Sequence, residues 1–459
     1  MIRRLLLAAA TALVVAAPAA AKGISQDVTL TMSDGVQVAC TYWSPQGVEA
    51  IRVPGVMLFH GLGGKRQDMA GDAETLAFGG YAALACDARG HGQSGGLFGL
   101  DGLRDVQDTQ ELVDWLGSQP GVRADAIGAL GVSLGGGVVW NAAAAGVPFK
   151  AIVPVVTWTS LREALAPQGL AKSGLVLYLS QLVPQERYEP ALLTGLPALL
   201  AGGTLDALAG PRSVAGLLPR ITVPTLVVQG RHDLLFDLDQ GIAAYRALGG
   251  PKRLYMGDLD HDPSPNPPKE LAVLAGQVRL WFDRYLKGIP NGVEKTAPIL
   301  LAADPWTDRV ATYRRLPPTQ QLTIRFAGRT TIAQGGKVAR VVRLPRLRET
   351  FGDSVVSFTA SSTTGWDHVV AVVSYGDTVV SVGGAPVALG ASPRTVHVHL
   401  LDQAVRIPRG ARLTLTIAAT STAQDRANLL YATDVQPGAT LTVGAATLAL
   451  SVLRVPVSR

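Results

Sequence analysis

The chain has 459 residues, of which 41 are basic and 35 acidic, so its formal net charge is +6 at neutral pH. The basic residues are scattered and form no run of the kind that binds nucleic acid, so nucleic acid is not an expected partner. A chain of this length is long enough for two or three structural units. Beyond residue 21, no apolar stretch is long enough for a membrane helix, so no stable membrane span is expected after processing.

Residues 1–21 have the pattern of a secretory signal peptide. Arg3 and Arg4 precede an apolar stretch over residues 5–17, and the small residues at 19–21 offer a cleavage site. The apolar part is too short to span a bilayer. We expect the mature protein to start near Lys22 and to be secreted or periplasmic.

The following segment predicts strands of an α/β sheet, each leading into a loop. Residues 56–59 (VMLF) predict a buried strand that runs into residues 60–64 (HGLGG). In serine hydrolases of the α/β class, the loop at this place supplies one backbone N–H of the oxyanion hole, which here is that of Leu62. A second loop follows a strand that ends at Cys86, and we interpret its Asp87 and Arg89 as hydrogen-bonding struts.

Residues 131–135 (GVSLG) match the G-x-S-x-G nucleophile elbow. An apolar run over 126–130 leads in and predicts a strand, and a run of small residues over 136–145 leads out and predicts a helix. Flanking glycines let the strand and the helix approach each other, so that the hydroxyl of Ser133 is exposed at the end of the strand. The N–H of Leu134, directly after the nucleophile, is the second expected oxyanion donor.

Residues 160–220 interrupt the alternation of strands and helices. They are rich in leucine and alanine and are broken by prolines such as Pro167 and Pro197. An insertion of this kind between two sheet strands predicts a helical cap over the site. Its apolar faces either line a pocket for an acyl group or side chain, or pack only on the domain below.

A serine nucleophile needs a base, and the base needs an orienting acid. On this fold the acid and then the histidine follow the serine along the chain. Asp233 comes shortly after a predicted buried strand at 224–230, and His261 follows a short strand at 253–256. Parallel strands bring their C-terminal ends to one rim of the sheet, so Ser133, Asp233 and His261 are the expected catalytic residues.

Neighbouring residues offer alternatives to this assignment. His232 adjoins Asp233, but a neighbour in sequence cannot easily reach both that carboxylate and Ser133. Asp206 could replace Asp233 as the acid, although no strand leads into it. Three aspartates close to the expected base either favour its imidazolium form or are solvated loop charges: Asp258, Asp260 and Asp262.

From residue 297 the pattern changes to alternating Val, Thr and Ile with glycine turns. Residues 321–326 (QLTIRF) and 412–417 (RLTLTI) are examples. Short alternating strands at regular spacing predict a β-sandwich over residues 297–459. The preceding unit is expected to span residues 22–290.

Together these segments resemble the family of X-Pro dipeptidyl peptidases and cocaine-esterase-like acyl hydrolases. The shared motifs are the loop at 60–61, residues 87–96 (DARGHGQSGG), the elbow, residues 151–158 (AIVPVVTW) and residues 229–233 (QGRHD). The resemblance implies an α/β-hydrolase sheet with a helical cap, followed by a C-terminal jelly-roll-like β-sandwich. It also implies a tyrosine in the oxyanion hole, but this chain has GLGG at 61–64, which favours a hole made of two backbone amides.

Three functions are compatible with these features. We expect a secreted serine hydrolase that cleaves a small-molecule ester or amide through an acyl-enzyme intermediate. An X-Pro dipeptidyl peptidase or another serine peptidase acting on short peptides is the alternative, and a non-enzymatic binding protein fits the predicted triad least. A dipeptidyl peptidase needs a carboxylate for the substrate's ammonium group, and the candidates in the cap are Glu163, Glu186, Glu189 and Asp206.

The remaining histidines and cysteines predict neither a metal nor another cofactor for the chemistry. No Cys/His group has zinc spacing, and His397 and His399 share one face of a strand without a third ligand nearby. Cys40 and Cys86 lie in predicted strands that the family resemblance places side by side, so a disulfide is conceivable. Buried free thiols are the preferred prediction, because secreted disulfide frameworks belong mainly to small, cysteine-rich domains.

Overall fold

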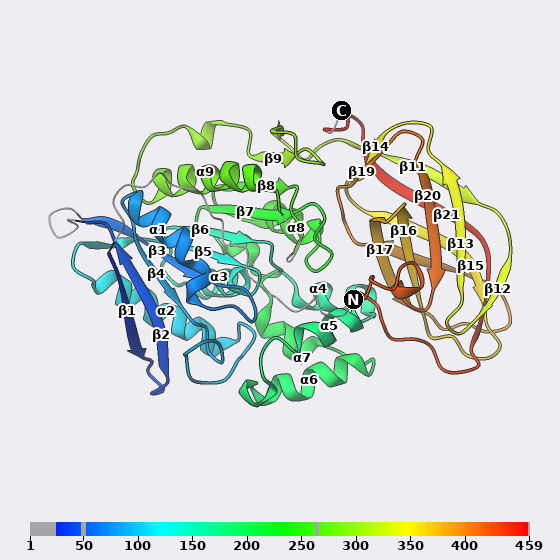
Figure 1. The fold of residues 1–459 in the computed structure, drawn as a ribbon, viewed down its shortest axis with the longest axis horizontal. Helices are drawn as coiled ribbons and strands as arrows, with labels where there is room; N and C mark the ends of the chain where they lie inside the picture. The colour runs from blue at the N-terminus through cyan, green and yellow to red at the C-terminus, as the bar shows by residue number, and fades with distance from the viewer. Residues whose placement is uncertain (1–23, 47–51, 262–265, 458–459) are drawn as a thin grey trace.

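The computed structural model describes residues 24–46, 52–261 and 266–457, and the predicted signal peptide lies outside them. An α/β part and a β-sandwich lie side by side (Figure 1), the sandwich being formed by the yellow-to-red end of the chain. The predicted fold class, an α/β-hydrolase sheet with a helical cap followed by a β-sandwich, is therefore confirmed.

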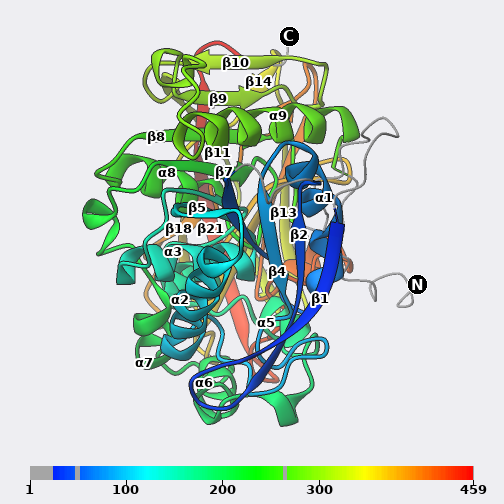
Figure 2. The same cartoon turned by 90° about the vertical axis from the view of Figure 1, so that its left-hand side faces the viewer.

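Within the described residues, the α/β part is built on a ten-stranded sheet with the order β1-β2-β4-β3-β5-β6-β7-β8-β9-β10. The strands from β4 to β9 in this order are parallel, whereas β1, β2 and β10 pair antiparallel at the two edges. Figure 2 views the sheet from the side of β1 and β2. The strands are β1 (Ile24–Thr31), β2 (Gln37–Ser44), β3 (Val53–Phe59), β4 (Ala82–Cys86), β5 (Val122–Val132), β6 (Ala151–Val155), β7 (Thr225–Gly230), β8 (Lys252–Gly257), β9 (Ile299–Ala302) and β10 (Val310–Tyr313).

Helices cover both faces of this sheet, which is why its central strands are apolar without alternation. On one face, α2 (Leu103–Ser118), α3 (Leu134–Ala145) and α8 (Leu238–Ala247) pack against the sheet. On the other face, α1 (Ala70–Phe78) and α9 (Pro268–Tyr285) do so. No helix among the described residues combines the length and the apolar character that a membrane crossing requires.

The segment between β6 and β7 forms the cap, and its regular structure is helical. Short helices make it up, several of them with a proline in the first turn, and α6 also contains Pro197. They are α4 (Leu161–Leu165), η4 (Pro167–Gly169), α5 (Ser173–Leu179), η5 (Gln185–Arg187), α6 (Pro190–Leu200), α7 (Asp206–Ala209), η6 (Gly210–Arg212) and η7 (Leu218–Arg220).

In the described part of the chain, the sandwich consists of two antiparallel sheets around one apolar core. One sheet has the order β11-β21-β15-β18, with β12 also paired to β21, and the other has the order β13-β20-β16-β17. A short β14–β19 pair forms a separate two-stranded sheet next to β21. The strands are β11 (Thr319–Phe326), β12 (Thr330–Ala333), β13 (Lys337–Arg343), β14 (Arg348–Glu349), β15 (Ser354–Ser361), β16 (His368–Tyr375), β17 (Thr378–Pro386), β18 (Arg394–Leu400), β19 (Arg406–Ile407), β20 (Arg412–Ala418) and β21 (Thr440–Leu453).

The sandwich starts later than the sequence predicts. Residues 297–313 have the alternating residue pattern of the sandwich strands. However, β9 pairs parallel with β8 and β10 pairs antiparallel with β9, so both strands extend the α/β sheet. The predicted start at residue 297 therefore needs correction, because the strands of the sandwich begin with β11 at Thr319. The residue pattern alone does not distinguish an edge strand of the α/β sheet from a strand of the sandwich.

The preferred prediction of free thiols is wrong, because Cys40 and Cys86 form a disulfide with an S–S distance of 2.04 Å. The two strands that carry them, β2 and β4, are antiparallel neighbours, and Cys40 lies directly opposite Cys86. Directly opposite residues point to the same face of a sheet, with their Cβ atoms close enough for a disulfide.

Asp237 of the α/β part and Asp402 of the sandwich part meet where the two parts join. The Asp402 N–H donates to Asp237 Oδ2 at 3.0 Å, and the Asp402 carbonyl accepts from the N–H of Leu238 at the start of α8. Burial, together with nearby carboxylates, raises the pKa of Asp237 to about 6 and that of Asp402 to about 8. Both groups therefore hold protons in the folded chain at a pH at which the unfolded chain has lost them.

We predict that the Asp402→Asn variant is stabilised relative to the wild type increasingly as the pH rises from 5 to 8. An aspartate of ordinary pKa, about 4, ionises in the unfolded chain first, so the free energy of unfolding of the wild type falls between about pH 4 and pH 8. Asparagine cannot ionise and escapes this loss. Thermal melts should show a gain in Tm of about 2 °C or more at pH 8.

The exposed Asp377→Asn variant is the matched control and should show no such trend. A difference in Tm between Asp402→Asn and wild type that is the same at pH 5 and pH 8 would contradict the prediction.

Candidate active site

The turn between β5 and α3 places Ser133 in a strained backbone conformation. Ser133 has φ 56° and ψ −116°, in the region that L residues rarely adopt. A Cβ on Gly131 would clash with the carbonyl oxygen of Gly135, and a Cβ on Gly135 would clash with that of Phe59. Only glycine fits at these two positions, which explains the sequence of the elbow.

Ser133, His261 and Asp233 form a continuous hydrogen-bonded chain. Ser133 Oγ lies 2.9 Å from His261 Nε2, and His261 Nδ1 lies 2.8 Å from Asp233 Oδ2. Because a carboxylate only accepts, Nδ1–H donates to Asp233 and Nε2 is left to accept from the serine hydroxyl. The three residues follow β5, β8 and β7, whose C-terminal ends meet at one rim of the sheet, as the sequence predicts.

The carboxylate of Asp233 is fully buried and held on both oxygens. Its Oδ1 accepts from the N–H groups of Leu235 and Phe236 at 2.9 and 2.8 Å, so Oδ2 remains for His261. The ring of Phe236 packs edge-on against the imidazole, with 5.1 Å between ring centroids. These contacts hold the Asp233 carboxylate and the His261 ring in one orientation.

Two residues that the sequence analysis does not single out support the loop of the acid. Lys172 of the cap is buried and donates through Nζ to the carbonyls of Leu234 and Leu235, both at 3.0 Å. Burial lowers the pKa of Lys172 to about 8. Gln403 of the sandwich part donates from Nε2 to the Asp233 carbonyl at 2.7 Å. A lone lysine in an apolar cap is a signal that sequence analysis could use, but nothing in the sequence marks Gln403.

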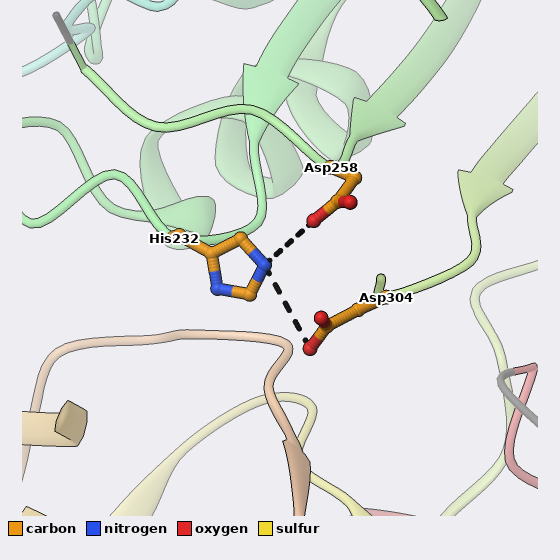
Figure 3. A group of neighbouring side chains, drawn as sticks. All are labelled: His232, Asp258 and Asp304. Atoms are coloured by element: carbon orange, nitrogen blue, oxygen red, sulfur yellow. Dashed lines mark hydrogen bonds and ion pairs between the residues drawn. The ribbon is translucent and has the colours of Figure 1, made fainter. Parts of the chain in front are cut away.

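The alternative base and acid lie elsewhere. His232 Nε2 contacts Asp258 Oδ1 at 2.9 Å (Figure 3), whereas the imidazole that contacts Ser133 Oγ is that of His261. Asp206 is exposed and pairs with Arg162. Asp260 accepts the N–H of His261 through its carboxylate, and burial raises its pKa to about 6. Asp262 lies outside the described residues.

The loop at residues 60–64 lies against the nucleophile. A Cβ on Gly61 would be 3.6 Å from the Ser133 Cβ, and both Leu62 and Leu134 border the same cavity as Ser133. His60 is buried, and its Nε2 accepts the N–H of Ala88 at 3.0 Å, so it ties this loop to the loop after β4. Donation from the N–H groups of Leu62 and Leu134 to an oxyanion stays a prediction.

The loop after β4 is braced by ion pairs. Asp87 accepts from the backbone and the guanidinium of Arg66, at 2.7 and 2.5 Å. Arg89 pairs with Asp108 of α2 and with Asp34. These buried contacts keep the loop rigid behind the site.

An apolar cavity lies between the cap and the nucleophile. Its lining consists of Leu62, Phe98, Leu100, Ser133, Leu134, Trp158, Leu161, Leu165, Val176, Leu179, Ser180, Tyr188, Leu192, Leu196, Leu235 and Phe236. None of these lining residues, as the described part of the chain places them, is charged. The apolar faces of the cap therefore line a pocket, which is one of the two alternatives that the sequence leaves open.

The cap carboxylates considered for an ammonium group do not line this cavity. Glu163 and Glu186 are exposed. Glu189 lies 3.5 Å from the buried guanidinium of Arg212, and Asp206 pairs with Arg162 at the surface.

Residues 34–263, a span that includes Ser133, Asp233 and His261, match the family model of the X-Pro dipeptidyl-peptidase (S15) family. The chain belongs to this family. The family is named for a hydrolytic activity, which favours an enzyme over the alternative of a non-enzymatic binding protein.

Curated relatives match over shorter segments. An uncharacterised protein of Pseudomonas aeruginosa is 29% identical over 139 residues, which cover 30% of this chain and 38% of the relative. An uncharacterised 31.7 kDa protein of Escherichia coli is 34% identical over 153 residues, covering 33% of this chain and 52% of the relative. The chain thus spans about half or less of the length of these relatives.

Solved structures share the fold over nearly the whole chain. A CocE/NonD family hydrolase from Staphylococcus aureus superposes with a TM-score of 0.73 at 15% identity, over 94% of each chain. An aminopeptidase from a Thaumarchaeota archaeon gives 0.70 at 13% identity, over 94% of this chain and 97% of that one. An α-amino acid ester hydrolase gives 0.68 at 16% identity, over 95% and 98%.

We predict that Ser133→Ala lowers kcat by about 10⁴- to 10⁶-fold, because the acyl-enzyme cannot form without the nucleophilic oxygen. His261→Ala should cost a similar factor and Asp233→Asn less. The measurement is turnover of a nitrophenyl ester together with labelling by a fluorophosphonate probe.

His399→Gln, which changes an exposed histidine of the sandwich, is the control and should react and label as the wild type does. Labelling of Ser133→Ala by the probe would show that another residue is the nucleophile.

Proposed function

We propose that this hydrolase is a serine esterase that transfers a small apolar acyl group to Ser133 and then to water. The observation that carries the proposal is the hydrogen-bonded chain from Ser133 to His261 to Asp233, which opens onto a cavity without a charged lining residue among those described. Amides and short peptides are the second substrate class, in line with the family name.

The catalytic cycle follows from the hydrogen bonds of the three residues. Ser133 Oγ attacks the carbonyl carbon while His261 Nε2 takes its proton, and the alcohol then leaves with that proton. Water attacks the acyl-enzyme by the same route in reverse, with His261 as base. Asp233 keeps the Nδ1–H tautomer of His261 and stabilises the imidazolium that forms in each half-reaction.

Two backbone amides are proposed to stabilise the negative charge on the carbonyl oxygen. The N–H groups of Leu62 and Leu134 are the candidates, since both residues border the cavity beside Ser133. No side-chain donor is needed for this arrangement, which suits the absence of tyrosine from the sequence at residues 60–64.

The lining of the cavity favours esters over X-Pro peptides. A dipeptidyl peptidase must bind an ammonium group, which in a buried pocket requires a paired carboxylate. The cap carboxylates considered for this purpose lie at the surface or face Arg212. An ester also asks less of the site, because an alcohol leaves more readily than an amine.

We further propose that the protein acts in an oxidising compartment, secreted or periplasmic. The leader-like residues 1–21 support this, and so does the Cys40–Cys86 disulfide, since disulfides persist mainly outside the reducing cytosol.

We predict that kcat/KM for nitrophenyl acetate and butyrate exceeds that for the anilides of Gly-Pro and Ala-Pro. The physical reasons are the easier leaving group and the apolar cavity. The measurement is the initial rate of the wild type with each substrate, after subtraction of the background rate of the Ser133→Ala variant. The opposite order, together with a strong dependence on a free substrate N-terminus, would favour the peptidase.

We also predict that Leu196→Trp shifts the substrate preference towards esters with shorter acyl chains. Leu196 borders the cavity from α6, so a larger side chain there should lower kcat/KM for an octanoyl ester by about 10-fold relative to the acetyl ester. Leu193→Trp, on the exposed side of the same helix, is the matched control. If both variants changed the ratio of kcat/KM for the octanoyl ester to kcat/KM for the acetyl ester equally, the cavity would not be the acyl-binding site.

A further inference from the structure

A second group of polar side chains lies at the same rim of the sheet, outside the triad. His232, Asp258 and Asp304 come within two residues of the ends of the adjacent strands β7, β8 and β9 (Figure 3). His232 Nε2 points between the two carboxylates, at 2.9 Å from Asp258 Oδ1 and 3.7 Å from Asp304 Oδ2. The three donor atoms all lie within 4.8 Å of one another.

These distances suit a metal ion. With bonds of about 2.0–2.2 Å, neighbouring donors in a tetrahedral or octahedral shell are about 3.0–3.5 Å apart. The two distances from His232 bracket this range. A cation between the three atoms would therefore need only small side-chain movements.

The backbone already orients both carboxylates. Asp258 Oδ2 accepts the N–H of Trp306 at 2.6 Å, which leaves Oδ1 directed at His232. Asp304 Oδ2 accepts the N–H of Arg406, also at 2.6 Å. Contacts of this kind fix metal ligands in place and reduce the cost of binding.

The donor set selects the kind of cation. An imidazole nitrogen with two carboxylates suits Zn²⁺ and related first-row divalent ions. Ca²⁺ takes six to eight oxygen ligands, so a site with a nitrogen donor and two carboxylates suits it poorly. The side chains are about one tenth to one quarter exposed, which leaves access for the ion and for water as a further ligand.

We propose that His232, Asp258 and Asp304 form a binding site for a divalent first-row cation such as Zn²⁺. The site joins the ends of three strands to the sandwich through Arg406. Its role is structural, because the triad has its own base and acid and needs no metal for acyl transfer.

Zinc titration of the metal-free protein tests the proposal. Full-length mature protein is treated with EDTA, dialysed, and titrated with Zn²⁺ by calorimetry and in thermal melts. We expect one Zn²⁺ per chain and a rise in Tm of about 3 °C or more at a large excess over Kd. Ester turnover at 25 °C should persist in EDTA.

Variants locate the ion. His232→Gln and Asp304→Asn should each weaken Zn²⁺ binding by at least about 10-fold, with circular dichroism in EDTA confirming that they fold. His399→Gln, which alters an exposed His–Asp pair of 3.1 Å, and His261→Ala should bind Zn²⁺ as the wild type does.

Three outcomes would overturn the proposal. They are no rise in Tm of the wild type with Zn²⁺, undiminished binding by His232→Gln and Asp304→Asn, or loss of binding in His261→Ala. No rise in Tm with Zn²⁺ would mean that His232 is simply a hydrogen-bonded imidazole between two carboxylates. Loss of binding in His261→Ala would place the ion at Ser133, His261 and Asp233.

Discussion

The arrangement of the α/β part and the sandwich depends on the interactions of one buried group, the guanidinium of Arg231. It pairs with Glu349 at 2.5 Å, and both side chains are completely buried. It also donates to the carbonyls of Ala404 and Ala302, while the second oxygen of Glu349 accepts the N–H of Val457. A buried charge is tolerated only when it is paired and its remaining hydrogen-bonding groups are satisfied, so these segments must meet in one geometry.

Arg231 lies two residues before Asp233, the candidate catalytic acid, and so links this geometry to the candidate site. Arg231 is anchored between the sheet and the sandwich, and its carbonyl accepts from Ala404 at 3.0 Å. Asp233 follows in the same loop, where Lys172 of the cap holds the backbone from one side and Gln403 holds it from the other. The sheet, the cap and the sandwich therefore all contribute to the position of one carboxylate. The sandwich is thus part of the scaffold of the site and not only an appended module.

Much of the α/β part and its candidate site could be predicted from the sequence, because the relevant signals are local. The elbow needs glycines within two residues of Ser133, and each of the three candidate catalytic residues follows a recognisable apolar strand, so chain order and strand ends are enough to bring them together. The features that the sequence leaves open depend on strand register and pairing. The family resemblance places the strands of Cys40 and Cys86 side by side, but the disulfide also requires the register in which the two residues lie directly opposite each other. Strands β9 and β10 differ from sandwich strands only in what they pair with. Gln403 and Glu349 act across more than a hundred residues of sequence, which no local pattern records.

The loops after β7 and β8 each serve two purposes. His232 and Asp233 are adjacent, yet one side chain faces Asp258 and the other faces His261. Asp258 likewise precedes the base by three residues, and it is held by Trp306 in the segment that leads to β10. Because His232 and Asp233 face different partners, consecutive side chains of this loop take part in two separate clusters. A shift of the loop after β7 or of the loop after β8 would move both clusters together. The polar contacts that tie the cluster of His232, Asp258 and Asp304 to the sandwich therefore also constrain the distance between Asp233 and His261. This shared backbone gives a physical reason for the hydrogen-bonded chain of Ser133, His261 and Asp233 to be held in one geometry.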